Sequence, residues 1–180
     1  MQPRSKLTSL ALMATMVGTC ALASAANPSA KSVIAAASAK AKAEKKNVMV
    51  IFHASWCGWC HRMDAFLESP EFKAAFDKSY VITHVDVLEQ PAKKDLENAG
   101  GVDLMTQLGG KDAGLPFFAI LNPSGIKISD SLLSDGKNMG FPSEPQEIAG
   151  FKTLLEKSAP KMSRSDISKI TAFLSVKKTH

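Results

Sequence analysis

The segment Val48-Met49-Val50-Ile51-Phe52, followed shortly by Cys57-Gly58-Trp59-Cys60-His61, decides the fold of this chain. The first segment is a continuous apolar run of strand length, which is typical of a central strand covered on both faces. Apolar residues recur at helical spacing from Cys60 onward, so Cys57 falls at the N-terminus of a helix. Two thiols at this spacing can close a small reversible disulfide, or hold a metal ion or a haem.

Strand and helix patterns alternate through the rest of the chain. An Ala- and Lys-rich segment, 31–46, predicts a surface helix before the first strand. The other expected helices are at 57–66, after a capping Ser69, at 91–98, at 102–108, at 144–157 and after a capping Ser163. The other expected strands are at 80–88 and, as an antiparallel hairpin, at 116–121 and 126–129. This order predicts an α/β fold with a central mixed β-sheet and helices on both faces.

The first 25 residues have the pattern of an export signal. Arg4 and Lys6 precede an apolar stretch that is too short for a comfortable membrane span, and Ala23-Ser24-Ala25 offers a cleavage site. We therefore expect a signal peptide at 1–25, one domain at 26–158 and a helical extension at 159–180. The mature protein is then periplasmic, or secreted where there is no outer membrane, and it has no membrane anchor.

Charge and cysteine content narrow the class of protein further. Cleavage after Ala25 removes two basic residues, so the formal net charge falls from +5 to +3, too small a surplus to indicate nucleic acid or membrane binding. Cleavage also removes Cys20 and leaves Cys57 and Cys60 as the thiols. A disulfide loop this small takes little entropy from the unfolded chain, so it would stabilise the fold only slightly. The pair is therefore expected to be reactive rather than structural.

The position of Cys57 indicates its role in such a reaction. A thiolate at a helix N-terminus faces unpaired amides and the positive end of the helix dipole, which lower the pKa of the thiol. Cys57 is therefore the expected nucleophile. Cys60, one turn inside the helix, is expected to attack the mixed disulfide and release the substrate as a thiol. This exchange needs no metal or organic cofactor.

The segment Trp56-Cys57-Gly58-Trp59-Cys60, together with Gly114-Leu115-Pro116 before the hairpin, resembles the thioredoxin superfamily, and most of all its exported bacterial thioredoxin-like members. The resemblance covers residues 32–157. It implies a thioredoxin-like fold, here with an extra C-terminal helix. The activity it implies is that of a thiol-disulfide oxidoreductase, monomeric, which acts on protein or small-thiol substrates and exchanges electrons with an unidentified redox partner protein. It also implies a cis peptide bond before Pro116, which faces the cysteines, and a Leu115 backbone that pairs with the substrate.

Two positions depart from thioredoxin proper. The dipeptide between the cysteines is Gly58-Trp59 rather than Gly-Pro, and because this dipeptide helps to set the redox potential, the direction of transfer stays open. The position six before the first cysteine, where thioredoxins carry a buried acid, is Ile51. Strand alternation places His53 on the same face as Ile51, directed toward the cysteine pair. We hypothesise that His53 takes the proton of Cys60; alternatively, it is a packed or solvated residue at the strand end.

Haem attachment is one alternative interpretation of the cysteine motif. The segment 57–61 matches the attachment motif of c-type haem, in which two thioethers hold the porphyrin and a histidine ligates the iron. Met105 or Met139 could then be the second axial ligand. The strand-rich plan, however, offers no evident haem pocket.

Metal binding is a second alternative. His53, Cys57, Cys60 and His61 form a mixed thiolate and imidazole set that would suit zinc or copper. Adjacent residues of one helix diverge by about 100°, so Cys60 and His61 rarely meet at one ion. In the simpler interpretation, His61 is an exposed helix residue near the cysteines, and no metal is bound.

A non-catalytic binding module is the third alternative. A hydrophobic lip of Trp56, Trp59 and Leu115, next to Pro116, could hold a peptide, and the same lip would let a redox enzyme grip unfolded substrates. We expect Trp56 to be packed and Trp59 to be exposed. Phe141 could join the lip, but it more simply anchors its own loop and is left out of the site. The presence of both cysteines favours catalysis over binding alone.

Overall fold

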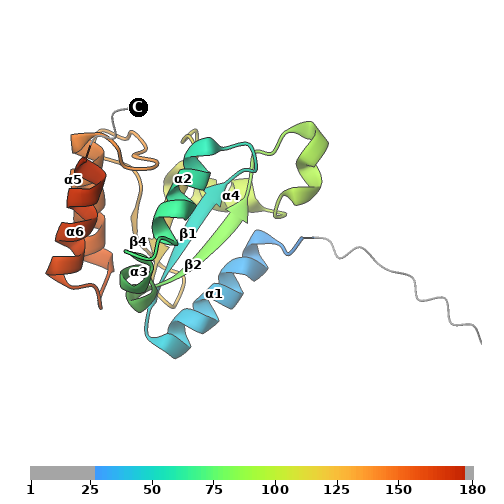
Figure 1. The fold of residues 1–180 in the computed structure, drawn as a ribbon. Coiled ribbons are helices and arrows are strands. Elements are labelled where there is room, and N and C mark those ends of the chain that lie inside the picture. Colours follow the sequence, from blue (N-terminus) through green and yellow to red (C-terminus); the bar gives the residue numbers. More distant parts are fainter. Residues whose placement is uncertain (1–26, 177–180) are drawn as a thin grey trace, which may run out of the picture.

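The computed structural model describes residues 27–176. The expected signal peptide at 1–25 lies outside the described residues, as do residues 177–180. Figure 1 shows a central sheet with helices packed on both of its faces. None of the helices between residues 27 and 176 has both the length and the apolar character needed to cross a membrane.

The described part of the chain forms a four-stranded sheet in the order β2-β1-β3-β4. The bounds are Asn47–His53 for β1, Tyr80–Asp86 for β2, Phe117–Leu121 for β3 and Lys127–Asp130 for β4. β1 runs parallel to β2 and antiparallel to β3, while β3 and β4 form the predicted hairpin. The apolar residues of β1 are buried on both faces of the sheet, as expected for a central strand. The mixed sheet predicted from the sequence is therefore confirmed.

Alternate residues of β1 supply two separate cores, one on each face of the sheet. One face carries α1 (Ala30–Glu44) and α4 (Gly101–Met105); the other carries α2 (Gly58–Leu67), α3 (Lys73–Ser79), α5 (Pro145–Ser158) and α6 (Arg164–Ser175). Val48, Val50 and Phe52 belong to the first core. Met49 and Ile51 belong to the second, because successive side chains of a strand point to opposite faces.

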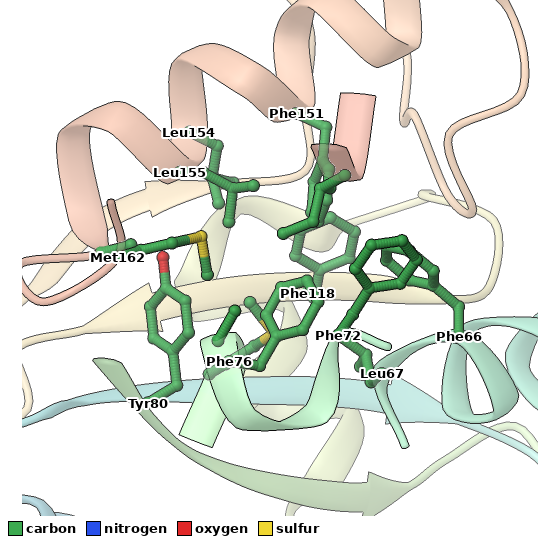
Figure 2. Packing of buried hydrophobic residues seen from close by; sticks show 14 of the residues in the cluster. Phe66, Leu67, Phe72, Phe76, Tyr80, Phe118, Phe151, Leu154, Leu155 and Met162 are labelled. Atoms are coloured by element: carbon green, nitrogen blue, oxygen red, sulfur yellow. The ribbon is translucent and has the colours of Figure 1, made fainter. Parts of the chain in front are cut away.

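Aromatic side chains fill the core under α2, α3 and α5. Figure 2 shows Phe151 of α5 pointing toward Phe118 of β3, with Phe66 and Phe72 beside it. The ring centroid of Phe151 lies 6.0 Å from that of Phe118 and 6.4 Å from that of Phe66, in edge-on arrangements. Such geometry is favourable for aromatic pairs. The core therefore ties α2, the helix that begins at the cysteines, to the C-terminal helices.

The C-terminal helix α6 packs on the domain beside α5, as Figure 1 shows. The Ser163 hydroxyl accepts the backbone N–H of Asp166, and the Asp166 carboxylate accepts the backbone N–H of Ser163 in return. This capping box begins the helix where the sequence predicts it. The apolar stripe of α6, made of Ile167, Ile170 and Leu174, is buried in the same core as Phe151. The extra C-terminal helix is confirmed, and the domain itself covers its stripe.

The predicted cap at Ser69 is wrong. Helix α3 begins at Lys73, and Phe72 occupies the N-cap position without a side-chain hydrogen bond. The Ser69 hydroxyl is buried and has no hydrogen-bond partner among the described residues, while its carbonyl accepts the Lys73 N–H at 2.9 Å. The side chain of Phe72 is buried in the core, and this burial holds the start of α3 in place of a side-chain cap.

The two short helices after β2 also differ from the expectation. The first is a 3₁₀ segment, η1 (Pro91–Leu96), and the second is α4, which continues into a π-helical turn, η2 (Thr106–Gly110). Every residue of η1 is exposed. A regular helix there would have no apolar face to bury, which favours the short, irregular form.

Candidate functional site

The two cysteines lie where β1 gives way to α2 and are joined by a disulfide. The S–S distance is 2.05 Å and the Cα atoms are 5.2 Å apart. Cys57 occupies the N-cap position of α2, and its sulfur accepts the backbone N–H of Cys60 at 3.1 Å. Cys57 is 4% exposed and Cys60 is fully buried. The less buried of the two residues is thus the one whose sulfur receives a helix N-terminal amide, which would stabilise a thiolate formed there.

The turn before Cys57 is held by side chains from three directions. The Ser55 backbone N–H donates to Glu89, and the Ser55 hydroxyl donates to the other oxygen of the same carboxylate at 2.9 Å. The Ser55 carbonyl lies 3.1 Å from His61 Nε2, which donates to it. Lys93 Nζ donates to the Ser55 hydroxyl at 3.2 Å. The backbone that leads into the cysteine pair therefore has a fixed path.

Trp56 is not packed, contrary to the expectation from the sequence. Trp56 and Trp59 are each 51% exposed. The indole N–H of Trp56 donates to the Leu88 carbonyl at 2.9 Å, which holds the ring on the surface against the segment after β2. An indole with a polar partner at the surface does not need burial to be fixed in place. The exposure of Trp59 agrees with the expectation.

The loop before β3 lies against the cysteines. The Leu115–Pro116 peptide bond is cis, as the resemblance implies. The Leu115 side chain packs against the small cluster that contains both cysteines. Asn138 Nδ2 donates to the carbonyls of Gly114 and Pro116, at 2.6 and 3.0 Å, and so holds this loop from the far side. Asn138 was not predicted as a site residue.

A groove of about 750 Å³ opens beside the cis-proline loop. Its walls include Trp59, Leu115, Asn138 and Phe141. The rings of Trp59 and Phe141 are stacked with centroids 6.2 Å apart, and the Arg62 guanidinium lies 4.9 Å from the Trp59 centroid. Phe141 also contacts the core ring of Phe66, so it both anchors its loop and lines the groove. The groove combines aromatic walls with polar backbone, which suits an extended peptide.

His53 lies on the face of the sheet that α2 covers. It is opposite Asp86 in the β1–β2 register, and its Nε2 lies 3.0 Å from the Asp86 carboxylate. Its ring is 4.7 Å from that of His84, which bonds Asp64 of α2 at 2.8 Å. His53 Nδ1 is buried and has no hydrogen-bond partner among the described residues. Burial, followed by the neighbouring His84, lowers the pKa of His53 despite the opposing charge of Asp86.

The residues considered for metal or haem do not gather at one point. Among residues 27–176, no three His, Cys, Asp or Glu side chains are placed to hold a metal ion. His53 is engaged with Asp86, whereas His61 is exposed and bonded to a backbone carbonyl. Met105 and Met139 are buried in the cores on opposite faces of the sheet.

Comparison with known proteins gives one family and several similar folds. Residues 29–123, more than half of the chain, match the model of a family described as thioredoxin-like. A disulphide isomerase from Xylella fastidiosa Temecula1 is 19% identical with a TM-score of 0.49, over 81% of this chain and 90% of that one. The oxidised C-terminal domain of DsbD from Neisseria meningitidis is 22% identical with a TM-score of 0.45, over 74% and 99%. A thioredoxin from Thermus thermophilus is 21% identical with a TM-score of 0.42, over 72% and 82%.

Comparison with curated proteins gives no match. The structural similarities are low and do not bear on activity. The segment that matches the family model contains the strand that leads to the cysteines, both cysteines and the cis-proline loop. It is also the part that forms β1, β2 and β3 of the mixed sheet. The chain belongs to the thioredoxin-like family.

Proposed function

We propose that this chain is a thiol-disulfide oxidoreductase, and that it works after export, in the periplasm. One observation carries the proposal: a disulfide joins Cys57 to Cys60, and a helix N-terminal amide donates to the sulfur of Cys57. The same amide stabilises the Cys57 thiolate after reduction, and only a thiolate attacks a disulfide efficiently. The aromatic groove beside the pair supports protein substrates over very small thiols.

The exchange proceeds in two balanced steps when the cysteines start as thiols. The Cys57 thiolate attacks one sulfur of a substrate disulfide, forms a mixed disulfide and releases the other substrate sulfur as a thiolate. The Cys60 thiolate then attacks the Cys57 sulfur, closes the Cys57–Cys60 disulfide and releases the second substrate thiolate. Two electrons pass from the chain to the substrate, and a partner dithiol must return them. Run backward, the same steps oxidise a substrate dithiol.

Substrate chains are proposed to lie along the groove and the cis-proline loop. Trp56 and Trp59 flank Cys57-Gly58 in the sequence, and the ring of each is half-exposed. Leu115 packs at the cysteines, and its backbone precedes Pro116 in a loop whose carbonyls Asn138 bonds. Aromatic side chains provide a large apolar contact at a small cost in conformational entropy.

The test of this function is the equilibrium between the Cys57–Cys60 pair and glutathione. We expect both sulfurs to titrate together as a two-electron couple, at a potential between about −270 mV, as in thioredoxin, and about −120 mV, as in a strong oxidant. The mature chain is prepared with and without haem maturation, and the free thiols are counted by alkylation and intact mass. Cysteines that fail to titrate because they carry haem or metal would rule out the enzyme and support an attachment site.

His53 is proposed to take the proton of Cys60 during the second step. Because Nε2–H donates to the Asp86 carboxylate, the neutral ring leaves Nδ1 as an unprotonated acceptor in the interior. Burial and the neighbouring His84 lower the pKa of His53, which favours the neutral ring. A neutral imidazole with a free lone pair is the form that a general base requires.

His53→Ala is therefore expected to slow disulfide reduction at neutral pH, on the order of a hundredfold. The rate then rises only as Cys60 ionises unaided, so the pH profile moves toward the ordinary cysteine pKa of about 8.5. The profile is measured from pH 5 to 9 with a fixed disulfide substrate. His61→Gln, which removes an exposed imidazole but keeps a donor for the Ser55 carbonyl, is the control. An unchanged profile in His53→Ala would show that His53 is only a packed residue.

A further inference from the structure

A buried carboxylate bonds the turn that precedes the cysteine pair, and the exchange reaction does not use it. Glu89, in the segment between β2 and η1, is 4% exposed. Both of its oxygens bond Ser55, one through the backbone N–H and the other through the hydroxyl. The Glu89 backbone N–H donates to Glu97 at 2.7 Å, which fixes the position of the residue itself. Ser55 is two residues from Cys57.

The hydrogen-bond pattern around Ser55 indicates that Glu89 is ionised. Lys93 Nζ donates to the Ser55 hydroxyl, so this hydroxyl accepts from Lys93 and directs its own proton to Glu89. Both Glu89 oxygens therefore act as acceptors, as a carboxylate does. A buried charge of this kind is screened by water much less than an exposed one.

Reduction of the disulfide creates a second negative charge, two residues along the chain from the Ser55 that this carboxylate bonds. The disulfide is uncharged, whereas the reduced form carries the Cys57 thiolate at the N-cap of α2. Like charges at short range in a poorly screened environment disfavour each other. The disulfide does not experience this repulsion. Glu89 thus destabilises the reduced form relative to the oxidised form.

Other charged groups face the same turn and must be weighed against Glu89. Lys93 of η1 and His61 of α2 bond Ser55 from outside, but both are exposed, so solvent and salt weaken their fields. Glu97 bonds Lys94 as well as the Glu89 backbone, and that ion pair offsets its charge. The neighbouring strand ends carry the His53–Asp86 pair, in which Asp86 again adds negative charge. The Arg62 side chain stacks on Trp59 at the far side of the helix start. Glu89 is the most buried carboxylate of this set, so its charge is screened the least.

We propose that Glu89 is a positioning residue that holds the turn at Ser55 and biases the Cys57–Cys60 pair toward the reductant side. The inference rests on the proposed oxidoreductase function, because it assumes that the pair cycles. The charge of Glu89 lowers the reduction potential within the range that the dipeptide between the cysteines leaves open. With this charge the chain donates electrons to substrate disulfides more readily than it would without it.

The test compares the glutathione equilibrium of the full mature chain and four variants. Glu89→Gln keeps an acceptor for Ser55 but removes the charge, and it is expected to favour the reduced form about three- to tenfold, up to about 30 mV. Lys93→Gln removes the cation that donates to the Ser55 hydroxyl and is expected to shift the equilibrium the opposite way. Glu68→Gln changes an exposed carboxylate at the other end of α2 and is expected to leave it unchanged. Ser55→Ala keeps the charge and is expected to shift it less than Glu89→Gln.

The outcomes separate this inference from the proposed function. If the wild-type cysteines titrate but Glu89→Gln has the wild-type potential, the role of Glu89 is wrong and the oxidoreductase stands. A shift in Ser55→Ala as large as that in Glu89→Gln also overturns it, since geometry alone would then explain the effect. If no form titrates, both proposals fall. Lys93 is exposed, so Lys93→Gln tests the charge argument even if Glu89→Gln does not fold.

Discussion

Replacing Cys60 by serine is expected to stop turnover and to trap the chain in a mixed disulfide with its substrate. Cys57 can still attack a substrate disulfide, but nothing attacks the Cys57 sulfur to release the product. The serine hydroxyl is not ionised at neutral pH and cannot replace the thiolate. The adduct is measured by intact mass or on a non-reducing gel, at one substrate chain per protein. Added dithiol is expected to release it.

The matched variant is Cys57→Ser, which is expected to form no adduct and to have no activity above the uncatalysed exchange. Cys60 is fully buried, so an external disulfide cannot approach it from solvent. Each serine variant replaces one cysteine sulfur by an oxygen, and the two positions lie one helical turn apart. The variants therefore differ only in which sulfur remains. An adduct in Cys57→Ser and none in Cys60→Ser would show that the roles of the two cysteines are reversed.

The fold could be predicted because its determinants are local. The apolar run from Val48 to Phe52 has no polar position that could face solvent, so it had to be a central strand. The Ser163 capping box and the apolar spacing after it similarly specify α6 without reference to the rest of the chain. The cysteine pair could also be recognised from the sequence, because its chemistry depends on two cysteines three positions apart at the start of a helix.

The polar partners that hold the turns around the cysteines could not be predicted, because long-range contacts determine them. Glu89 is 34 positions from Ser55, and Asn138 reaches Gly114 across 24 positions. No local pattern marks either residue as a partner of the site. Trp56 was expected to be packed, but the Leu88 carbonyl holds its indole at the surface. Sequence patterns predict which segments are strands and helices, but these polar contacts form only once the segments are packed.

The helix that carries the cysteines is also expected to depend on the aromatic core behind it. Phe151→Ala should lower the free energy of unfolding by about 3–5 kcal/mol, because it removes a fully buried ring and leaves a cavity that its neighbours cannot fill. Rings from three elements lose a partner at once: Phe66 of α2, Phe76 of α3 and Phe118 of β3. The loss is a large part of the roughly 5–15 kcal/mol by which domains are stable.

Denaturant unfolding of the oxidised chain measures this change, with the midpoint expected to fall and the slope to stay the same. Ile126→Ala, which truncates a side chain that is 65% exposed at the hairpin turn, is the control and should change stability by less than about 0.5 kcal/mol. A loss below about 1 kcal/mol in Phe151→Ala would mean that α5 is not packed on the sheet as described. In that case α6 would also lose its support, because Ile167, Ile170 and Leu174 are buried in the same core. One substitution far from the cysteines thus tests the packing that places both C-terminal helices behind the site.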